Sequence, residues 1–290
     1  DDDDDDDAAA PFALVVVDEA HHVYGDPILK EAVEASVASS TRRLLLSDAS
    51  QAARQRHAAY PPGPCHEATL TEVVRCSRRI VAGAMAFQLG GDQKLLTASC
   101  QDDAGPPLKS FLFDAGADRF EAYAAFCRKA LEHVRDAFPR ARLDDRIAVA
   151  VPDAAFRDAL LARRPFPAFE TKTAAEASAR LPGVSDDGSK EWLLVDTVDH
   201  LDGLERLVVV CCGLDKKIDD AAPDTAARRS TLYRAVTRAH LMVVVVNEFV
   251  RGGWLEFLGS VRLRENETFD AAAELARAAP AAADAAVGAR

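Results

Sequence analysis

The sequence lacks both long apolar segments and paired cysteines. Its longest apolar runs, residues 207–212 and 241–246, are strand-sized and far short of the roughly 20 residues that a membrane helix needs. None of the six cysteines in the 290-residue chain belongs to a C-x-x-C pair. We therefore expect reduced thiols rather than a disulfide framework or a zinc site. With no secretory signal at the start, this indicates an intracellular protein, of the nucleus or cytoplasm.

Positive charge is also scarce. The chain has 35 Lys and Arg against 47 Asp and Glu, which gives a formal net charge of −12. A domain that binds nucleic acid by itself usually carries a basic excess, and this composition gives no sign of one. Local basic grooves stay compatible with the balance, because net charge bears on partners rather than on fold. Residues 1–7 are all Asp, so we expect residues 1–10 to be a disordered acidic tail.

What the sequence does contain is a regular alternation of strand and helix patterns. Apolar, β-branched runs predict strands at residues 12–17, 43–47, 146–151, 192–195, 207–212 and 241–246. Apolar residues at helical spacing predict helices at 27–37, 69–89, 120–138, 153–163 and 225–240. This alternation predicts an α/β fold built on mostly parallel sheets. Because both faces of residues 12–17 are apolar, we expect that strand to be buried on both sides.

Composition divides the chain into parts. Residues 60–64 contain three prolines and a glycine, which predicts a boundary there. Residues 11–59 would then form one part of the protein and residues 60–264 a second, larger part. Residues 265–290 are rich in alanine and have little apolar bulk to bury, so we expect them to form a tail.

Two carboxylates, Asp18 and Glu19, follow directly on the strand predicted at residues 12–17. Ligands of α/β sheets bind beyond the carboxyl ends of the strands. An Asp at such a position can hold Mg²⁺, and a neighbouring Glu can orient and deprotonate an attacking water. The alternative is a plain strand end with solvated acids. We expect the adjacent His21 and His22 to point in different directions, which would be a poor arrangement for a metal site.

Two further polar positions have both a functional and a structural interpretation. Gln51 follows the strand predicted at 43–47, and its amide can sense a γ-phosphate or position a water. The alternative for Gln51 is a polar turn. Arg75 lies in the string L-T-E-V-V-R-C-S-R-R-I at residues 70–80. Arg75, Arg78 and Arg79 could instead form the basic face of a helix.

Two strings in the second half of the chain are longer. Residues 196–205 read D-T-V-D-H-L-D-G-L-E, where Gly203 permits a tight turn before the next strand. Residues 232–240 read L-Y-R-A-V-T-R-A-H, on a predicted helix that leads into an apolar strand. The guanidinium of Arg238 has the donor geometry to stabilise charge that develops during phosphoryl transfer.

Taken in order, these five strings resemble the motifs of superfamily 1, UvrD-like helicases, which are P-loop NTPases. The resemblance starts at the D-E-A-H string of residues 18–21 and extends to residue 239. It implies RecA-like lobes that bind ATP and Mg²⁺ between them and use hydrolysis to move on DNA or RNA. The roles it implies are Mg²⁺ binding by Asp18, water activation by Glu19, γ-phosphate contact by Gln51, Arg75 and Arg238, nucleotide-sugar contact by Gly203 and Glu205, and nucleic-acid contact by Thr197 and His200.

The chain also departs from the family pattern. No G-x-x-x-x-G-K-[ST] string occurs, so the loop that cradles the β- and γ-phosphates is missing. Asp202 stands where many members have Lys or Gln, and a carboxylate beside a phosphate backbone is unfavourable. Arg54, Arg56 and His57 stand where the family has an aromatic residue that stacks on a base. The 70–80 string keeps the family's leucine, arginine and isoleucine but differs between them.

We therefore expect the end of one RecA-like lobe followed by a complete, minimal second lobe, as a fragment of an ATP-dependent helicase or translocase. Without the phosphate-binding loop, the chain is expected not to hydrolyse ATP by itself. The alternative is a catalytically inactive interaction module that kept the fold and lost the motor. The acidic charge and Asp202 favour the module, whereas the joint presence of Glu19, Gln51, Arg75 and Arg238 favours the motor.

Overall fold

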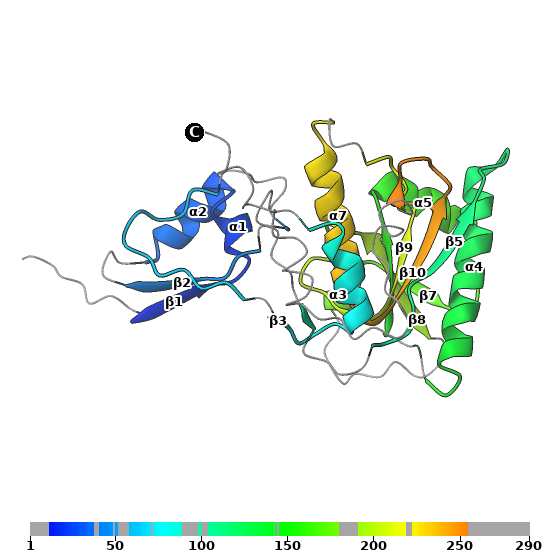
Figure 1. Cartoon of the computed structure of the whole chain (residues 1–290), viewed down its shortest axis with the longest axis horizontal. Coiled ribbons are helices and arrows are strands. Elements are labelled where there is room, and N and C mark those ends of the chain that lie inside the picture. Colours follow the sequence, from blue (N-terminus) through cyan, green and yellow to red (C-terminus); the bar gives the residue numbers. More distant parts are fainter. Residues whose placement is uncertain are drawn as a thin grey trace, which may run out of the picture. The chain divides into compact units, whose positions relative to one another are not determined.

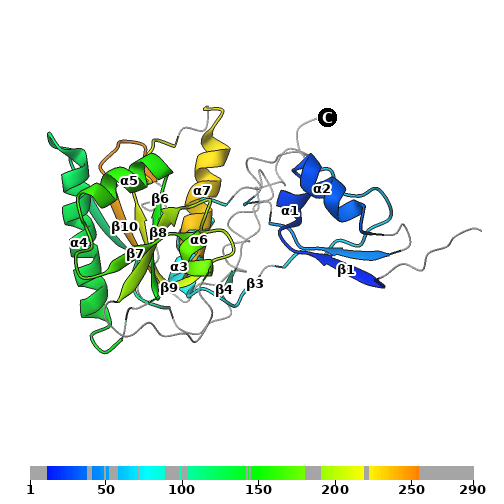
Figure 2. The same cartoon turned by 180° about the vertical axis from the view of Figure 1, so that it is seen from behind.

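A computed structural model describes residues 12–37, 41–48, 50–51, 58–70, 72–88, 98–99, 104–141, 143, 145–179, 191–218 and 222–254. The chain forms two compact units, residues 1–69 and 70–290, called here the first and the second unit (Figures 1 and 2). Each unit is described by itself. The predictions for the acidic tail, the alanine-rich tail and the segment with Arg54, Arg56 and His57 lie outside the described residues.

The first unit pairs two short parallel strands with two helices. Strand β1 (Leu14–Val17) lies beside β2 (Arg42–Leu45), with Val17 opposite Leu45. Between them in the sequence come α1 (Ala20–Val23) and α2 (Pro27–Glu34). Helix α2 begins where it does because the Asp26 carboxylate accepts the free N–H groups of Ile28 and Leu29, and because Pro27 suits a first helical position.

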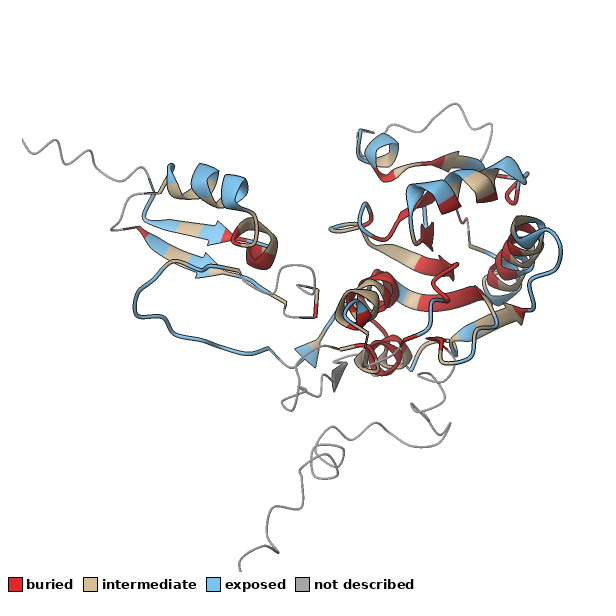
Figure 3. Cartoon of the chain, turned by 90° about the horizontal axis from the view of Figure 1, so that it is seen from above, coloured by how far each residue is buried: buried red, intermediate tan, exposed pale blue. Residues whose placement is uncertain are grey.

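The two faces of this small sheet differ in burial. Val17 packs with Ala20 and Tyr24, and Val15, Val33 and Leu45 lie against this core. Side chains alternate along a strand, and the alternate positions of β1, Leu14 and Val16, are 53% and 54% exposed. The expectation that residues 12–17 are buried on both sides is therefore wrong. Within the described residues, only the face carrying Val15 and Val17 is covered by α1 and α2 (Figure 3).

The second unit is built on six parallel strands. Their order across the sheet is β5 (Lys109–Phe113), β10 (Ala239–Glu248), β9 (Arg206–Cys212), β6 (Ile147–Val151), β8 (Trp192–Thr197) and β7 (Glu170–Lys172). Every pairing in it is parallel. All residues of β6 and β8 are buried, as expected for strands covered on both faces. The predicted α/β fold of RecA-like type is confirmed by this sheet.

Helices cover both faces of the six-stranded sheet. Helices α3 (Arg78–Met85), α6 (Ala174–Ser178) and α7 (Thr225–Thr237) pack against one face, and α4 (Arg119–Ala137) and α5 (Ala154–Ala162) against the other (Figures 1 and 2). Alternate residues of one strand serve the two cores: Val209 and Cys211 face the first layer, and Val208, Val210 and Cys212 the second. The sheet is thus the common wall of two apolar layers.

Several details differ from the sequence prediction. The helix expected at 69–89 is replaced by a strand, β3 (Glu72–Val73), and the shorter α3. Residue 77 is extended and its N–H bonds to the carbonyl of His240, which prevents the helix from starting earlier. Strand β3 pairs with β4 (Ala98–Ser99). None of the described helices has the length and apolarity to cross a membrane, and the five described cysteines are free thiols.

Candidate functional site

Asp18 and Glu19 directly follow β1. Asp18 is exposed, and one of its carboxylate oxygens accepts the N–H of Glu19 at 2.9 Å. Glu19 has φ 49°, a left-handed conformation that is uncommon for a residue other than glycine. Such conformations cost free energy and concentrate at functional sites. The carboxylate of Asp18 fits Mg²⁺, a hard cation that binds one or two protein carboxylates and keeps several waters.

A chain of polar contacts, two of them hydrogen bonds, links Glu19 to Gln51 within the first unit. The ring of the buried His21 lies with Nε2 at 3.3 Å from a carboxylate oxygen of Glu19. Its Nδ1 accepts the backbone N–H of Asp48 at 3.3 Å. The Asp48 carboxylate in turn accepts the side-chain N–H of Gln51 at 2.9 Å. Two predicted residues are therefore joined by two that the sequence analysis did not select, His21 and Asp48.

The sequence held a signal for this link. His21 and Asp48 each lie just beyond the carboxyl end of a strand, and β1 and β2 are parallel neighbours. The carboxyl ends of neighbouring parallel strands meet at one edge of the sheet. Polar residues that follow such strands are thus expected to come together.

The side chains of Glu19, His21 and His22 also cluster. Their ligand atoms lie within 4.8 Å of one another, and the two imidazole rings are 4.3 Å apart. The expectation that His21 and His22 diverge is wrong, because their rings tilt against each other over the short α1. However, Nδ1 of His21 accepts an N–H, so the neutral ring carries its proton on Nε2, toward Glu19. One ring nitrogen of His21 is thus already engaged by a backbone N–H, and the other lies at ion-pair distance from Glu19.

In the second unit, Arg75 and Glu205 form an ion pair across 130 residues of sequence. Both side chains are about one-third exposed, at 34% each. Glu205 also lies 2.8 Å from Nε2 of His240. Burial raises the pKa of Glu205, but His240 and Arg75 outweigh it and hold that pKa below its ordinary value. The structure therefore brings together two residues selected from separate strings, and adds His240.

Two arginines of α7 face the same loop. Arg238 caps the carboxyl end of α7 and its side chain is only 4% exposed, with a guanidinium nitrogen 4.0 Å from Asp202. Arg234 lies one turn earlier, on the same side of the helix. It bonds to Asp202 through Nε at 3.0 Å and through Nη2, and to Asp199 at 2.8 Å. Arg234 was not predicted as a site residue, although its four-residue spacing from Arg238 was a signal.

These bonds explain the unusual Asp202. The sequence marked it as a carboxylate at a position where the resembling family carries Lys or Gln. Its partner in the structure is the buried guanidinium of Arg234, which needs a counter-charge in a site of low dielectric. Gly203, next to it, has φ +75° and no atom within 4 Å of the place of a Cβ. The turn there requires glycine because of its backbone conformation and not because of crowding.

Thr197 and His200 belong to a different cluster at the end of β8. The Thr197 hydroxyl accepts the N–H of His200 at 3.2 Å. Nδ1 of His200 lies 3.0 Å from the buried carboxylate of Asp196, while the imidazole side chain is 62% exposed. The two predicted nucleic-acid contacts thus lie at the start of the loop, bonded to Asp196 and not to the arginines of α7.

Asp196 is the centre of this second cluster. Its carboxylate accepts the backbone N–H groups of Thr197 at 2.8 Å and Ala174 at 2.9 Å, and Nη1 of Arg157 at 3.0 Å. Burial raises the pKa of Asp196, but the hydrogen bonds from Ala174, Thr197 and His200 outweigh burial and lower that pKa. Asp196 is therefore a fixed anion that orients His200 with its other ring nitrogen away from the carboxylate.

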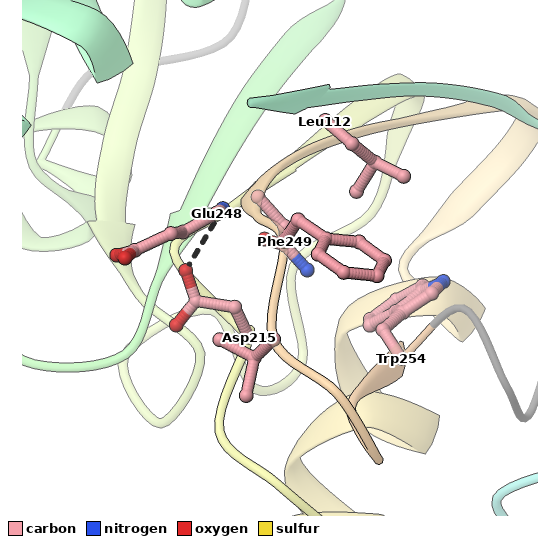
Figure 4. Close-up of a pocket in the computed structure, with 7 residues that line it drawn as sticks. Leu112, Asp215, Glu248, Phe249 and Trp254 are labelled. Atoms are coloured by element: carbon pink, nitrogen blue, oxygen red, sulfur yellow. Dashed lines mark hydrogen bonds between the residues drawn. The ribbon is translucent and has the colours of Figure 1, made fainter. Parts of the chain in front are cut away.

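A small pocket opens at the carboxyl ends of β5, β9 and β10 (Figure 4). Asp215 and Glu248 lie on one side of it, and Phe249 and Trp254 on the other. Its volume of ≈ 10 Å³ is room for about one water. The fully buried Asn247 and Trp254 each present an N–H without a hydrogen-bond partner among the described residues. A single ordered water satisfies such a site, which is too small for a nucleotide.

Comparisons with known proteins give a structural likeness but no matching family or curated relative. No family model matches the chain. No curated protein matches it either. Among solved structures, the chain is similar to the C-terminal domain of a possible DNA helicase from Lactobacillus plantarum WCFS1, at 16% identity and a TM-score of 0.40. That match covers 60% of this chain and 87% of the other. A likeness this distant carries no argument about function.

Proposed function

We propose that the chain is part of an ATP-dependent helicase or translocase of superfamily 1, which couples ATP hydrolysis to movement on DNA or RNA. The observation that carries the proposal is the meeting of Arg75 with Glu205, beside the loop that also faces Arg238, on an all-parallel sheet. These residues were selected from three separate strings as nucleotide contacts. Their convergence in one unit is what a nucleotide-contacting lobe requires.

The first unit would supply the residues for hydrolysis. Asp18 would hold Mg²⁺, which when bound offsets phosphate charge. Glu19, whose carboxylate lies 3.3 Å from the ring of His21, would take a proton from the attacking water. Gln51 would orient that water through its amide, which Asp48 already fixes. Arg75 and Arg238 would bind phosphate oxygens and stabilise the charge that develops on them.

Nucleic acid would be contacted at the start of the loop after β8. Thr197 offers a hydroxyl and His200 an exposed imidazole, and Asp196 fixes the orientation of that ring. Neither residue reads base edges from a helix or strand inserted in a groove. We therefore expect contacts to the sugar-phosphate backbone, which hold the strand without selecting its sequence.

The first test is binding of labelled single-stranded DNA and RNA at increasing salt. A motor fragment should lose affinity steeply as salt rises. A plot of log K against the logarithm of the salt concentration should fall with a slope of about −0.7 for each phosphate contacted. His200→Ala should weaken binding several-fold, and His66→Ala, which removes an exposed imidazole from the first unit, should leave it unchanged. Binding that does not depend on salt, or no binding to either single-stranded DNA or single-stranded RNA, would contradict the proposal.

The isolated chain is expected not to hydrolyse ATP, because no phosphate-binding loop occurs in its sequence. Phosphate release should stay at the background rate with Mg²⁺ and single-stranded nucleic acid present. Magnesium-dependent turnover that Glu19→Gln abolishes would contradict this expectation, while it would strengthen the assignment of Glu19.

A second candidate function is a protein-interaction module without nucleotide chemistry. The observation that favours it is the engagement of Arg234 and Arg238 by Asp202, which offsets charge that a motor would direct at phosphate. Such a module should show no salt-dependent binding of single strands, so the first test separates the two candidates.

A further inference from the structure

The loop between β8 and β9, residues 198–205, carries three carboxylates, and each has a basic partner outside the loop. Asp199 and Asp202 bind Arg234, and Asp202 also lies 4.0 Å from Arg238. Glu205 binds both Arg75 and His240. One short loop therefore provides acidic partners for four basic side chains, one at residue 75 and three within residues 234–240.

These acids lie on the solvent side of the arginines of α7. The side chains of Arg234 and Arg238 are 5% and 4% exposed, whereas those of Asp199 and Asp202 are 40% and 26% exposed. An anion that approaches from solvent thus meets the carboxylates before it reaches the guanidinium groups. Asp202 therefore competes with such an anion for the guanidinium of Arg238.

The chemistry of the bonds makes exchange feasible. A guanidinium presents the same planar donors to a carboxylate as to a phosphate, and both acceptors can bind it in a bidentate way. Asp202 accepts from both Nε and Nη2 of Arg234. Gly203, directly after it, has no atom within 4 Å of the place of a Cβ, so no side chain packs over that side of the turn.

We propose that Asp202 and Glu205 are internal substitutes for phosphate, which hold the basic cluster of Arg75, Arg234, Arg238 and His240 until a polyphosphate anion displaces them. The inference rests on the proposed function, since the anion would be the phosphate chain of a nucleotide. Arg234 is then a positioning residue that keeps Asp202 over Arg238. Displacement releases the loop, which follows Thr197 and contains His200, and so links phosphate binding to the proposed nucleic-acid contacts.

The test measures the affinity of the full chain for sodium tripolyphosphate by titration calorimetry. Asp202→Asn should bind it about tenfold more tightly than the wild type, because the competing negative charge is gone. Asp202→Glu keeps the charge and should bind as the wild type does. The matched control, Glu132→Gln, removes one exposed carboxylate from α4 and should have no effect. Equal affinities for Asp202→Asn and the wild type, or no binding by any variant, would overturn the proposal.

A second measurement needs no variant, in case Asp202→Asn does not fold. Amide hydrogen exchange of the wild type should become faster at residues 198–205 when tripolyphosphate is added, because the loop is released. Unchanged or slower exchange in that loop would overturn the proposal. If tripolyphosphate binds tightly and Asp202→Asn does not change its affinity, the displacement proposal is wrong, and the motor proposal is unaffected. Loss of salt-dependent single-strand binding would reject the motor alone.

Discussion

The backbone N–H of Asp48 donates to Nδ1 of His21 at 3.3 Å and ties the ends of two parallel strands together. The bond fixes which ring nitrogen of neutral His21 carries the proton, and that nitrogen faces Glu19. The distance from that nitrogen to a carboxylate oxygen of Glu19 is 3.3 Å. His21 is thus the residue on which the geometry of the first unit's acidic site depends.

Replacing His21 should therefore be costly. His21→Ala removes a buried ring and leaves the Asp48 N–H without its acceptor, so we expect the unfolding free energy to fall by about 2–4 kcal/mol. His22→Ala removes a half-buried neighbouring ring and should cost less than about 1 kcal/mol. Urea denaturation of both variants measures the difference. Equal losses would show that His21 has no special structural role.

The uneven burial of β1 gives a second prediction. Val17→Asp places a carboxylate among Ala20 and Tyr24 and should destabilise the first unit by about 3 kcal/mol or more. Val16→Asp places a carboxylate on the exposed face of the same strand and should cost about 1 kcal/mol or less. Thermal melts of the two variants compare adjacent positions in one strand. A large loss from Val16→Asp would mean that its face is buried in solution.

Two glycines with similar backbone angles should respond differently to alanine. The Cβ of Gly203→Ala would meet no neighbouring atom. The substitution should therefore cost only the strain of a positive φ in alanine, about 1 kcal/mol of unfolding free energy. Gly213→Ala, at φ +73°, would overlap the ring of Phe156 and should cost about 3 kcal/mol. Phe156→Leu should recover part of that loss in the double variant, as a double-mutant cycle would measure. If the losses from Gly213→Ala and Phe156→Leu simply add, the ring of Phe156 does not contact residue 213.

Asp196 predicts a pH dependence. Its folded pKa lies below the ordinary value of 3.8, so its charge stabilises the fold above pH 3.8, and that stability is lost as pH falls through the folded pKa. Asp196→Asn should lower the unfolding free energy by about 2 kcal/mol near neutral pH. The difference in unfolding free energy between Asp196→Asn and the wild type should become smaller below pH 3.8. The control, Asp158→Asn, changes a 66% exposed carboxylate and should show a small gap throughout. A gap for Asp196→Asn that stays constant in acid would contradict the assigned pKa.

The sequence predicted four of the six strands of the larger sheet, β6, β8, β9 and β10, but neither β5 nor β7. Strands such as β6 and β9 have long apolar runs because helices bury both their faces, and such runs are visible without a structure. The same pattern misled at residues 12–17, since apolar residues on both faces show what a strand can bury and not what lies against it. Short elements such as β7, Glu170–Lys172, have too few residues for any periodicity to appear.

Motif order was enough to select Arg75, Glu205 and Arg238, but not their partners. Ion pairs such as Arg75 with Glu205 join residues far apart in sequence, and no local pattern encodes that meeting. Asp202 shows the limit most clearly. From the sequence it was a departure from a family pattern, whereas its function in the fold is to neutralise Arg234, a position that the string had not marked.

The place of β10 in the sheet bears on how the protein is made. Strand β10 lies between β9 and β5, so the last of the described strands to be synthesised is inserted between two that precede it. Until then, β5 has no neighbour in the sheet as described. Pairing across so much sequence is slow, and exposed strand edges aggregate. The nascent chain is therefore expected to stay open, and to need chaperone protection, until translation has passed residue 248.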